Sequence, residues 1–456
     1  MRGALPRLLL GAPASGGGKT TLTCGLLKAL VDRGEAPTAF KCGPDYIDPM
    51  FHSEVIGAHS RNLDLFLLGE DNVRALLWEN GRQGSVALLE GAMGYYDGIA
   101  MSPEASAWDL AVRTQTPSVL VLDARGRALS AAALVKGFTS FRSPSQIQGV
   151  VLNRISPMLY PRLRDMLEYE TGVKVYGFLP ECPECMLESR HLGLVPAAEV
   201  AALREKLSQL AAQVEENVDI EGLLELARSA PDLEVTEQPL VRPVAGRPRI
   251  AVARDRAFCF YYADGLEQLE RLGAELVEFS PLADPALPQG TCGLYLGGGY
   301  PERYAKELAA NTALLREIHD KILRGLPTVA ECGGFLYLNR RLTDADGRYD
   351  WGMAGVVPGS ARSMGRLNRF GYVTLTAQKD GLLCRAGETI PAHEFHYWDS
   401  DAPGAGFRAD KPLSGRGWAC GWHTPSLYAG FPHFHFRAVP DSARRFVQAA
   451  ADWNPS

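Results

Sequence analysis

The sequence has no long apolar run, no excess of basic residues and no dense cysteine framework. Its longest apolar stretches, such as residues 118–123 and 149–152, have the length of a strand. A membrane-spanning helix needs about 20 apolar residues. The formal net charge of −6 and the lack of a clustered basic stripe argue against nucleic acid as a partner. We therefore expect no membrane span and no nucleic-acid partner.

The nine cysteines are scattered along 456 residues, which suits a reducing compartment. The apolar part of the N-terminal segment is very short and runs into glycines, so we interpret it as a first strand and expect a cytoplasmic protein. Cys182 and Cys185 form one CPEC unit. Two thiols are half the ligand set of a structural zinc and no second pair lies nearby, so we interpret this pair as structural or incidental.

The length and the patterning divide the chain into two halves. A chain of 456 residues exceeds the size at which one hydrophobic core keeps growing. From residue 7 to about 180, continuous apolar runs alternate with helical patterns, which is typical of a parallel sheet covered on both faces. Residues 196–229 are expected to be helical. Residues 229–248 hold four prolines and indicate a linker.

After the linker the alternation of strand and helix restarts in a smaller α/β domain. One helix is expected over residues 301–324, followed by a strand that ends at AEC, residues 330–332. Beyond residue 340, short runs rich in glycine and aromatics predict an irregular or antiparallel portion, closed by a helix near residues 440–452. The predicted domains are residues 1–230 and residues 248–456, joined by a linker at residues 231–247.

Residues 12–21, APASGGGKTT, lie between a predicted strand and a predicted helix and resemble a phosphate-binding loop. Glycines let backbone N–H groups turn toward phosphate oxygens, and the helix N-terminus adds a positive dipole. Lys19 is placed to reach the β- and γ-phosphates, and Thr20 to bind Mg²⁺. The match to GxxxxGK[ST] is imperfect because Pro13 occupies the first glycine position. The loop residues assigned to ATP are Gly16, Gly18, Lys19, Thr20 and Thr21.

Carboxylates follow the next predicted strands, at the edge where open parallel sheets bind ligands. Asp45 and Asp48 lie in KCGPDYIDPMFH, Glu90 lies near the end of SVALLEG, and Asp97 lies in GYYDG. Mg²⁺ prefers one or two carboxylates together with waters and phosphate oxygens. We favour Glu90 as the metal ligand and keep Asp123, at the end of PSVLVLD, as a rival.

The second half carries a candidate nucleophile. Cys332 is followed by two glycines at a strand-to-helix junction, which resembles a nucleophile elbow, and the start of a helix lowers the pKa of a thiol placed there. The backbone N–H groups of Gly298, Gly299 and Gly333 are candidates for an oxyanion hole. A thiolate needs a base, and His433 is the candidate.

GGGYPE, AECGGFLYL and the late HFHF resemble the triad-type glutamine amidotransferase domain of the CobB/CobQ group. With SGGGKTT, KCGPDYIDPMFH, LLEGAMGYYDG, VVLNR, RHLGLVP and HEFHY, the whole chain resembles the cobyrinate a,c-diamide synthase family. The N-terminal half of that family is similar in fold to dethiobiotin synthetase, a P-loop enzyme that activates an acid with ATP. The resemblance implies an α/β chain with a P-loop NTPase domain followed by a class I amidotransferase domain.

For the second half, the resemblance implies that Cys332 attacks the side-chain amide of glutamine and releases ammonia, with His433 as acid and base. Ordinary triad amidotransferases carry His-x-Glu, whereas this chain has His435 at the third position, as the CobB/CobQ group does. Something other than a carboxylate at that position must therefore orient the imidazole of His433.

For the first half, the resemblance assigns Thr20, Asp45 and Glu90 to Mg²⁺. It places Lys41, Asp48 and Asp97 at the junction of metal, phosphate and substrate. Asn153, at the end of the run IQGVVLN, corresponds to the residue that reads adenine. A turn-forming asparagine before a helix is the alternative interpretation of Asn153.

The implied chemistry gives a reason for two sites in one chain. A carboxylate is a poor acyl donor, so ATP must phosphorylate it before ammonia can form the amide. Ammonia is mostly protonated at neutral pH, so we expect it to pass between the sites without entering bulk water. We predict an amidoligase that uses ATP, Mg²⁺ and glutamine on the a and c acetates of cobyrinate, in cobalamin biosynthesis.

The alternatives differ mainly in substrate. Hydrogenobyrinate, Ni-sirohydrochlorin and sirohaem offer the same paired acetates, whereas KCGPDYIDPMFH looks like the diamide synthases rather than cobyrate synthase. A partitioning-type ATPase with a degenerate glutaminase-like domain is disfavoured by Ala14, where that group carries a lysine, and by the intact Cys332 and His433. The sequence does not give the oligomeric state and leaves a homodimer open.

Overall fold

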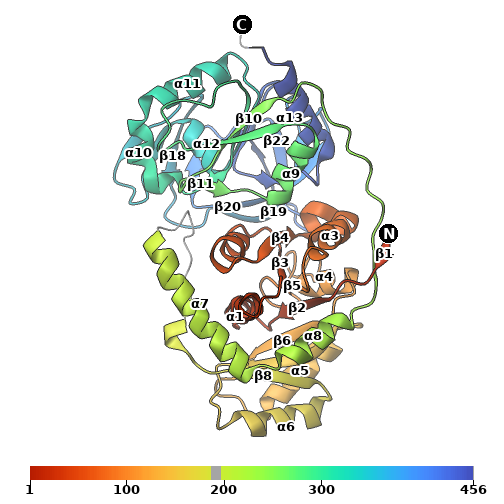
Figure 1. Cartoon of the computed structure of the whole chain (residues 1–456). Helices are drawn as coiled ribbons and strands as arrows, with labels where there is room; N and C mark the ends of the chain where they lie inside the picture. The colour runs from red at the N-terminus through yellow and green to blue at the C-terminus, as the bar shows by residue number, and fades with distance from the viewer. Residues whose placement is uncertain (186–196, 455–456) are drawn as a thin grey trace. The chain divides into compact units, whose positions relative to one another are not determined.

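The computed structural model describes residues 1–185 and 197–454, so the RHLGLVP motif at residues 190–196 lies outside the described residues. The chain divides into two compact units, Met1–Gln238 and Pro239–Ser456 (Figure 1). The division falls within residues 231–247, the segment that the sequence predicts as a linker.

The first unit is built on a seven-stranded sheet whose neighbouring strands are all parallel, in the order β4-β3-β5-β2-β6-β7-β8. The strands are β2 (Arg7–Gly11), β3 (Thr38–Cys42), β4 (His59–Leu63), β5 (Ala87–Glu90), β6 (Ser118–Asp123), β7 (Ile147–Asn153) and β8 (Lys174–Leu179). Parallel strands are buried on both faces, which explains their continuous apolar runs. The sequence did not predict β4, because the residues HSRNL of this edge strand are mostly polar.

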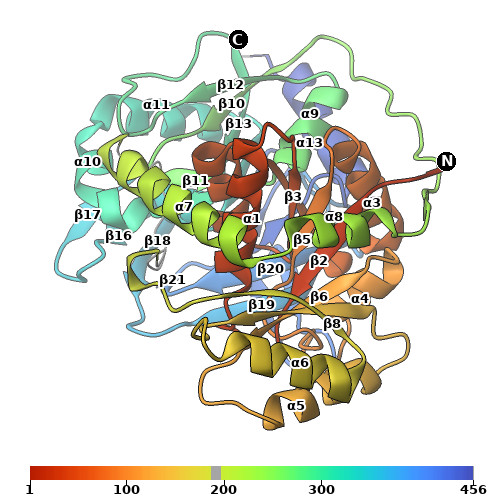
Figure 2. The same ribbon diagram turned by 60° about the horizontal axis from the view of Figure 1, so that its bottom comes forward.

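Helices occupy the connections between these strands, and two further helices, α7 and α8, follow the last strand. They are α1 (Lys19–Asp32), α2 (Ile47–Met50), the π-helix η1 (Phe51–Ile56), α3 (Leu65–Gly81), α4 (Ala107–Arg113), α5 (Ser130–Ser140), α6 (Tyr160–Thr171), α7 (Ala197–Asn217) and α8 (Ile220–Arg228). Helices α1 and α7 lie side by side (Figures 1 and 2). A Cβ on Gly25 of α1 would lie only 2.7 Å from the side chain of Val214, so glycine permits this close packing.

Two smaller features complete the first unit. The short strands β1 (Arg2–Gly3) and β9 (Leu233–Glu234) pair antiparallel, so the segment after α8 returns to the beginning of the chain. A disulfide joins Cys182 and Cys185 at the 3₁₀ turn η2 (Pro183–Cys185), which fits a structural pair rather than a zinc site. The other seven cysteines form no disulfide.

The second unit contains a six-stranded sheet in the order β12-β10-β13-β15-β25-β24, parallel except for the last pair. Its strands are β10 (Arg249–Ala253), β12 (Glu275–Phe279), β13 (Thr291–Leu296), β15 (Thr328–Glu331), β24 (Trp422–His423) and β25 (Leu427–Gly430). Its helical elements are α9 (Ala263–Arg271), η3 (Pro301–Tyr304), α10 (Ala305–Ala310), α11 (Thr312–Leu323), α12 (Gly333–Leu338) and α13 (Pro440–Asp452).

The single helix expected over residues 301–324 is wrong, because the segment is divided into η3, α10 and α11. Asn311 stands between α10 and α11 with φ −80° and ψ 59°, outside the helical region. Its side-chain amide donates to the carbonyls of Pro281 and Asp284 at 3.0 and 2.8 Å. These tertiary hydrogen bonds compensate for the interruption of the helix.

The predicted antiparallel portion is confirmed for the residues that follow α12. Two sheets form there, in the orders β17-β16-β18-β21 and β23-β22-β19-β20-β26, and only β16 and β18 among the described pairs run parallel. Their strands are β16 (Asn339–Thr343), β17 (Asp350–Gly352), β18 (Val357–Ser363), β19 (Arg369–Ala377), β20 (Thr389–His396), β21 (Trp398–Ser400), β22 (Phe407–Asp410), β23 (Gly417–Cys420) and β26 (His433–Phe434). A separate pair joins β11 (Phe258–Phe260) to β14 (Gly298–Gly299).

No helix in the described part of the chain combines the length and the apolar character that crossing a bilayer would require.

Candidate active sites

The glycine-rich loop leads directly into helix α1, which begins at Lys19. Gly16 and Gly18 have φ angles of 75° and 99°, which L side chains rarely adopt. A Cβ on Gly18 would lie 1.9 Å from Nδ2 of Asn153, so the loop needs glycine there for space as well. Thr20 and Thr21 lie half-buried in the first turn of α1.

Asn153 lies against this loop. It is the last residue of β7, and its Nδ2 donates to the carbonyl oxygen of Gly17 at 3.1 Å. The side chain therefore braces the loop in which a nucleotide phosphate would be bound. Whether Asn153 also reads adenine stays a prediction.

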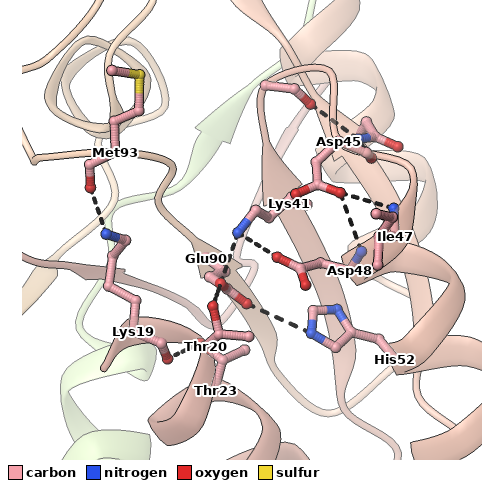
Figure 3. A network of polar contacts seen from close by, with 12 residues as sticks. Lys19, Thr20, Thr23, Lys41, Asp45, Ile47, Asp48, His52, Glu90 and Met93 are labelled. Carbon is pink, nitrogen blue, oxygen red and sulfur yellow. Dashed lines mark hydrogen bonds and ion pairs between the residues drawn. The ribbon is translucent and has the colours of Figure 1, made fainter. Parts of the chain in front are cut away.

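Glu90 lies at the centre of a buried polar network (Figure 3). Its Oε1 accepts hydrogen bonds from Thr20 Oγ1 at 2.5 Å and from Lys41 Nζ at 2.7 Å. Lys41 Nζ also lies 2.6 Å from the carboxylate of Asp48. Burial acts to lower the pKa of Lys41, but Glu90 and Asp48 outweigh it and hold the pKa above its usual value. Lys41 is thus a buried, charged lysine.

The fold explains why these side chains meet. Strands β3 and β5 are neighbours in the sheet, and their parallel register sets Lys41 directly opposite Glu90. His52, on the π-helix η1, places Nε2 3.6 Å from the second oxygen of Glu90. His52 belongs to the motif KCGPDYIDPMFH, but the sequence alone predicted no role for it.

The other loop acids of the first unit have local structural roles. Asp45 accepts hydrogen bonds from the backbone N–H groups of Ile47 and Asp48 at 2.8 and 3.2 Å. Burial and the neighbouring Asp48 raise the pKa of Asp45. Asp97 accepts from the N–H of Gly94 at 3.0 Å. Both carboxylates thus order the loops that flank the network.

Lys19 is held by main-chain oxygens. Its ammonium group donates to the carbonyl of Met93, and to that of Ala14 at 3.3 Å. Burial, together with the charge of Lys41, lowers the pKa of Lys19. A phosphate would be a stronger partner than these neutral carbonyls, because charge-assisted hydrogen bonds are roughly twice as strong as neutral ones.

Thr20 and Glu90 are the donors that fit Mg²⁺ best. In the described residues, no group of three or more His, Cys, Asp or Glu side chains could hold a metal ion without further ligands. The Thr20 hydroxyl and the Glu90 carboxylate instead offer two oxygen donors beside the loop. Two protein donors suit a cation that keeps several waters and binds phosphate oxygens.

Asp123, the rival metal ligand, is engaged by arginines. Its oxygens lie 3.0 Å from Arg125 and 2.9 Å from Arg154. Burial acts to raise its pKa, but the hydrogen bonds from Arg125 and Arg154 hold it below the usual value. These ion pairs make Asp123 the weaker candidate.

Cys332 stands in a strained turn between β15 and α12. Its φ of 45° and ψ of −96° lie outside the regions that non-glycine residues usually occupy. Its N–H donates to the carbonyl of Gly430 at 2.8 Å, and its own carbonyl accepts from the N–H of Leu336 at 2.9 Å. The strand, turn and helix have the order of a nucleophile elbow.

Glycines let the main chain pack closely around this turn. A Cβ on Gly334 would lie 2.1 Å from the carbonyl oxygen of Leu296, and a Cβ on Gly333 would lie 3.0 Å from the nitrogen of Gly299. A Cβ on Gly298 would lie 2.5 Å from the ring of His433. The three glycines assigned to the oxyanion hole therefore lie around the thiol and the imidazole. Their role in stabilising an oxyanion stays a prediction.

His433 lies between Cys332 and Glu331. It hydrogen-bonds to Cys332, and its Nδ1 lies 3.3 Å from Oε2 of Glu331. Burial acts to lower the pKa of His433, but the contacts with Cys332 and Glu331 outweigh it and raise the pKa to about 10. The sequence alone did not predict this role for Glu331.

His435 is turned away from this contact. Its ring stacks on Tyr262 with centroids 4.8 Å apart, and its Nδ1 accepts from the N–H of Arg437 at 3.2 Å. Burial, with a smaller effect of the Arg437 charge, lowers the pKa of His435 to about 3. His435 is therefore a neutral, packed side chain.

Comparison with known proteins gives matches over nearly the whole chain. Residues 9–195 match a family model described as the CobQ/CobB/MinD/ParA nucleotide binding domain, and residues 249–439 match the CobB/CobQ-like glutamine amidotransferase domain. Cobyrinate a,c-diamide synthase of Caldanaerobacter subterraneus is 38% identical over 96% of this chain and 97% of its own length. The enzyme of the same name from Salmonella typhimurium is 39% identical, covering 97% of each chain.

Two further proteins extend the comparison. Hydrogenobyrinate a,c-diamide synthase of Streptomyces coelicolor is 39% identical over 98% of this chain and 97% of its own length. Among solved structures, PurLQS of Thermotoga maritima covers 44% of this chain and 97% of its own, with a TM-score of 0.31 and 17% identity. That structural similarity is too low to support an inference.

Proposed function

Because the chain belongs to the cobyrinate a,c-diamide synthase family, we propose that it uses ATP and glutamine to convert the a and c acetates of cobyrinate into amides, a step of cobalamin biosynthesis. The observation that carries the proposal is the presence of two chemically distinct sites in one chain. Cys332 with His433 is suited to release ammonia, and the network around Glu90 is suited to activate a carboxylate. In this proposal residues 1–230 are the synthetase domain and residues 248–456 the glutaminase domain.

At the thiol site, His433 holds the proton of Cys332, and the thiolate attacks the side-chain amide carbon of glutamine. The backbone N–H groups of Gly298, Gly299 and Gly333 stabilise the negative charge that develops on the amide oxygen. His433 then gives the proton to the departing ammonia, which leaves a glutamyl thioester on Cys332. His433 next activates a water molecule, and hydrolysis of the thioester releases glutamate.

At the nucleotide site, a carboxylate oxygen of the substrate attacks the γ-phosphorus of ATP, ADP departs, and ammonia displaces phosphate from the acyl phosphate. Lys19 moves from its carbonyl partners to the phosphate oxygens and stabilises the charge in transit. Lys41, held between Glu90 and Asp48, places a second cation at the same edge of the sheet. Mg²⁺, which Thr20 and Glu90 would hold, neutralises phosphate charge when it is bound.

The substrate is best tested by product analysis. The protein would be incubated with ATP, Mg²⁺ and glutamine and, in turn, with cobyrinate, hydrogenobyrinate, Ni-sirohydrochlorin and sirohaem, with mass spectrometry as the readout. Stepwise conversion of cobyrinate to a monoamide and then a diamide is the expected result. Selective amidation of hydrogenobyrinate would favour the second candidate, which the Streptomyces coelicolor relative motivates. Failure to amidate any of the four would overturn the proposal.

A further inference from the structure

We propose that Glu331 is the positioning residue that orients His433, in place of the glutamate that ordinary triad amidotransferases carry two residues after the histidine. The proposal rests on the function assigned above to Cys332 and His433. His435 occupies the usual third position, but its ring stacks on Tyr262 and its Nδ1 is taken by the N–H of Arg437. The orienting group must therefore come from another part of the chain.

The contact between the two side chains is close and shielded from water. Nδ1 of His433 lies 3.3 Å from Oε2 of Glu331, and the two side chains are 4% and 1% exposed. A buried interaction of this kind is screened much less than one at the surface. Donation from Nδ1 to the carboxylate leaves Nε2 as the nitrogen that can accept the proton of the thiol.

Further donors hold the carboxylate of Glu331 in place. The N–H of Phe434 lies 3.4 Å from Oε1, and the hydroxyl of Tyr295, on β13, lies 3.4 Å from Oε2. With His433, three donors from separate positions converge on one carboxylate. Its orientation is therefore determined by the surrounding fold.

The strand pairing explains how these residues come together. Strands β15 and β25 run parallel with Glu331 opposite Gly430, and the N–H of Cys332 donates to the carbonyl of that same glycine. The chain reaches His433 three residues after Gly430. Successive side chains of a regular strand point to opposite faces, but the positive φ of Cys332 breaks the alternation. The carboxylate and the thiol of adjacent residues can therefore both contact one imidazole.

Besides Cys332, the titratable neighbours leave Glu331 as the negative group beside His433. Burial, with a contribution from Glu331, raises the pKa of Tyr295 and of Tyr428 well above the usual value. Burial, with a contribution from the charge of Glu331, also raises the pKa of Tyr261. On β20, burial and the charge of His433 lower the pKa of His393 to about 3, and burial lowers that of His396 to about 4. These neighbours are neutral near pH 7.

The test compares Glu331→Gln and Glu331→Asp with Glu394→Gln in the full-length chain. Glu394 is a second buried glutamate of the same unit, but its charge interacts with Arg369 and Lys411 rather than with His433. The main readout is the rate of Cys332 alkylation by iodoacetamide as a function of pH, corrected with Cys332→Ala. Glutamine kcat and KM and ammonia-dependent amidation are measured in parallel.

Glu331→Gln is expected to slow alkylation at pH 7 at least about tenfold and to move the profile to higher pH, because the imidazolium that stabilises the thiolate loses its partner. Glutamine kcat should fall roughly 10²–10⁴-fold with little change in KM, and ammonia-dependent amidation should remain. Glu331→Asp keeps the charge but is one methylene shorter, so it should give an intermediate profile. Glu394→Gln should match the wild type.

An unchanged alkylation profile in Glu331→Gln would overturn the proposal, as would an equal shift in Glu394→Gln. If the Gln variant does not fold, an unchanged profile in Glu331→Asp has the same consequence. A wild-type protein that hydrolyses no glutamine would instead contradict the proposed function, and the alkylation profiles would still decide the role of Glu331.

Discussion

The hydroxyl of Thr20 donates a hydrogen bond of 2.5 Å to the carboxylate of Glu90, a residue 70 positions away in the chain. Thr20 belongs to the helix that follows β2, and Glu90 ends β5, the strand paired with β2. Both side chains therefore lie at the carboxyl edge of the parallel sheet, where ligands of such sheets bind.

Glu90→Gln is expected to reduce ATP-dependent amidation roughly 10²–10³-fold, because the charge that would hold Mg²⁺ and that pairs with Lys41 is lost. Glutamine hydrolysis by Cys332 should persist. The measurement is ADP release in the presence of the tetrapyrrole and ammonia. Asp123→Asn is the control and should retain activity. Wild-type rates of coupled ADP and amide formation in Glu90→Gln would transfer the metal-ligand role to Asp123.

Lys19→Ala should also abolish amidation with either nitrogen donor, since the migrating phosphoryl charge loses its nearest cation. Lys28→Ala offers a matched control, because Lys28 lies on the same helix but pairs with Asp32 at some distance from the loop. ADP release and the shift of the melting temperature by ATP report the effect. Equal losses in the two variants would point to damage of the helix rather than of the loop.

Cys332→Ala is expected to eliminate glutamine-dependent amidation and to leave amidation with high ammonia at the wild-type rate, because only the nitrogen source is removed. Cys292→Ala, at a half-buried cysteine of the same unit, should behave as wild type with both donors. Loss of activity with both donors in Cys332→Ala would show that the cysteine is structural.

His433→Ala should lower glutaminase activity by roughly 10²–10⁴-fold, the contribution typical of a general acid and base. His435→Ala should cost much less, because that ring contacts Tyr262 and not the thiol. Steady-state glutamate release measures both variants. The reverse order of effects would make His435 the base.

Stability should fall as the pH decreases from about 6.5 toward 3, in part through His435. Its pKa is about 3 in the folded chain against 6.5 as the ordinary value, so the unfolded chain takes up the proton first. One such histidine contributes a loss of roughly 1–2 kcal/mol between about pH 6.5 and pH 5. His435→Phe should show a smaller acid loss in chemical denaturation. If the free energy of unfolding decreased equally with falling pH in the wild type and in His435→Phe, this assignment would be contradicted.

Local sequence patterns predicted the elements that depend on local chemistry. The inner strands of the parallel sheet in the first unit are continuous apolar runs, and the loop before Lys19 has the glycines that its turn requires. The edge strand β4 was missed because HSRNL lacks such a run. The break at Asn311 was missed because it depends on hydrogen bonds to the carbonyls of Pro281 and Asp284. The hydrophobic pattern of residues 301–324 contains no information about these distant partners.

The same distinction applies to the sites. Cys332 could be predicted because the glycines that shape its turn are its neighbours in the sequence. Glu331 could not, because its contact with His433 spans 102 residues and depends on the pairing of β15 with β25. The π-helix η1 places His52 beside Glu90, and the sequence motif alone does not predict a π-helix at this position.

The pairing of β15 with β25 also has a consequence during synthesis. During translation Cys332 emerges from the ribosome well before residues 427–433 are added. Those residues supply strand β25, which pairs with β15, and His433. Until those residues arrive, the thiol has neither its base nor the glycine carbonyl that secures its turn. A nascent or prematurely terminated chain that lacks them therefore cannot consume glutamine, and hydrolysis begins only after residues 427–433 have been made.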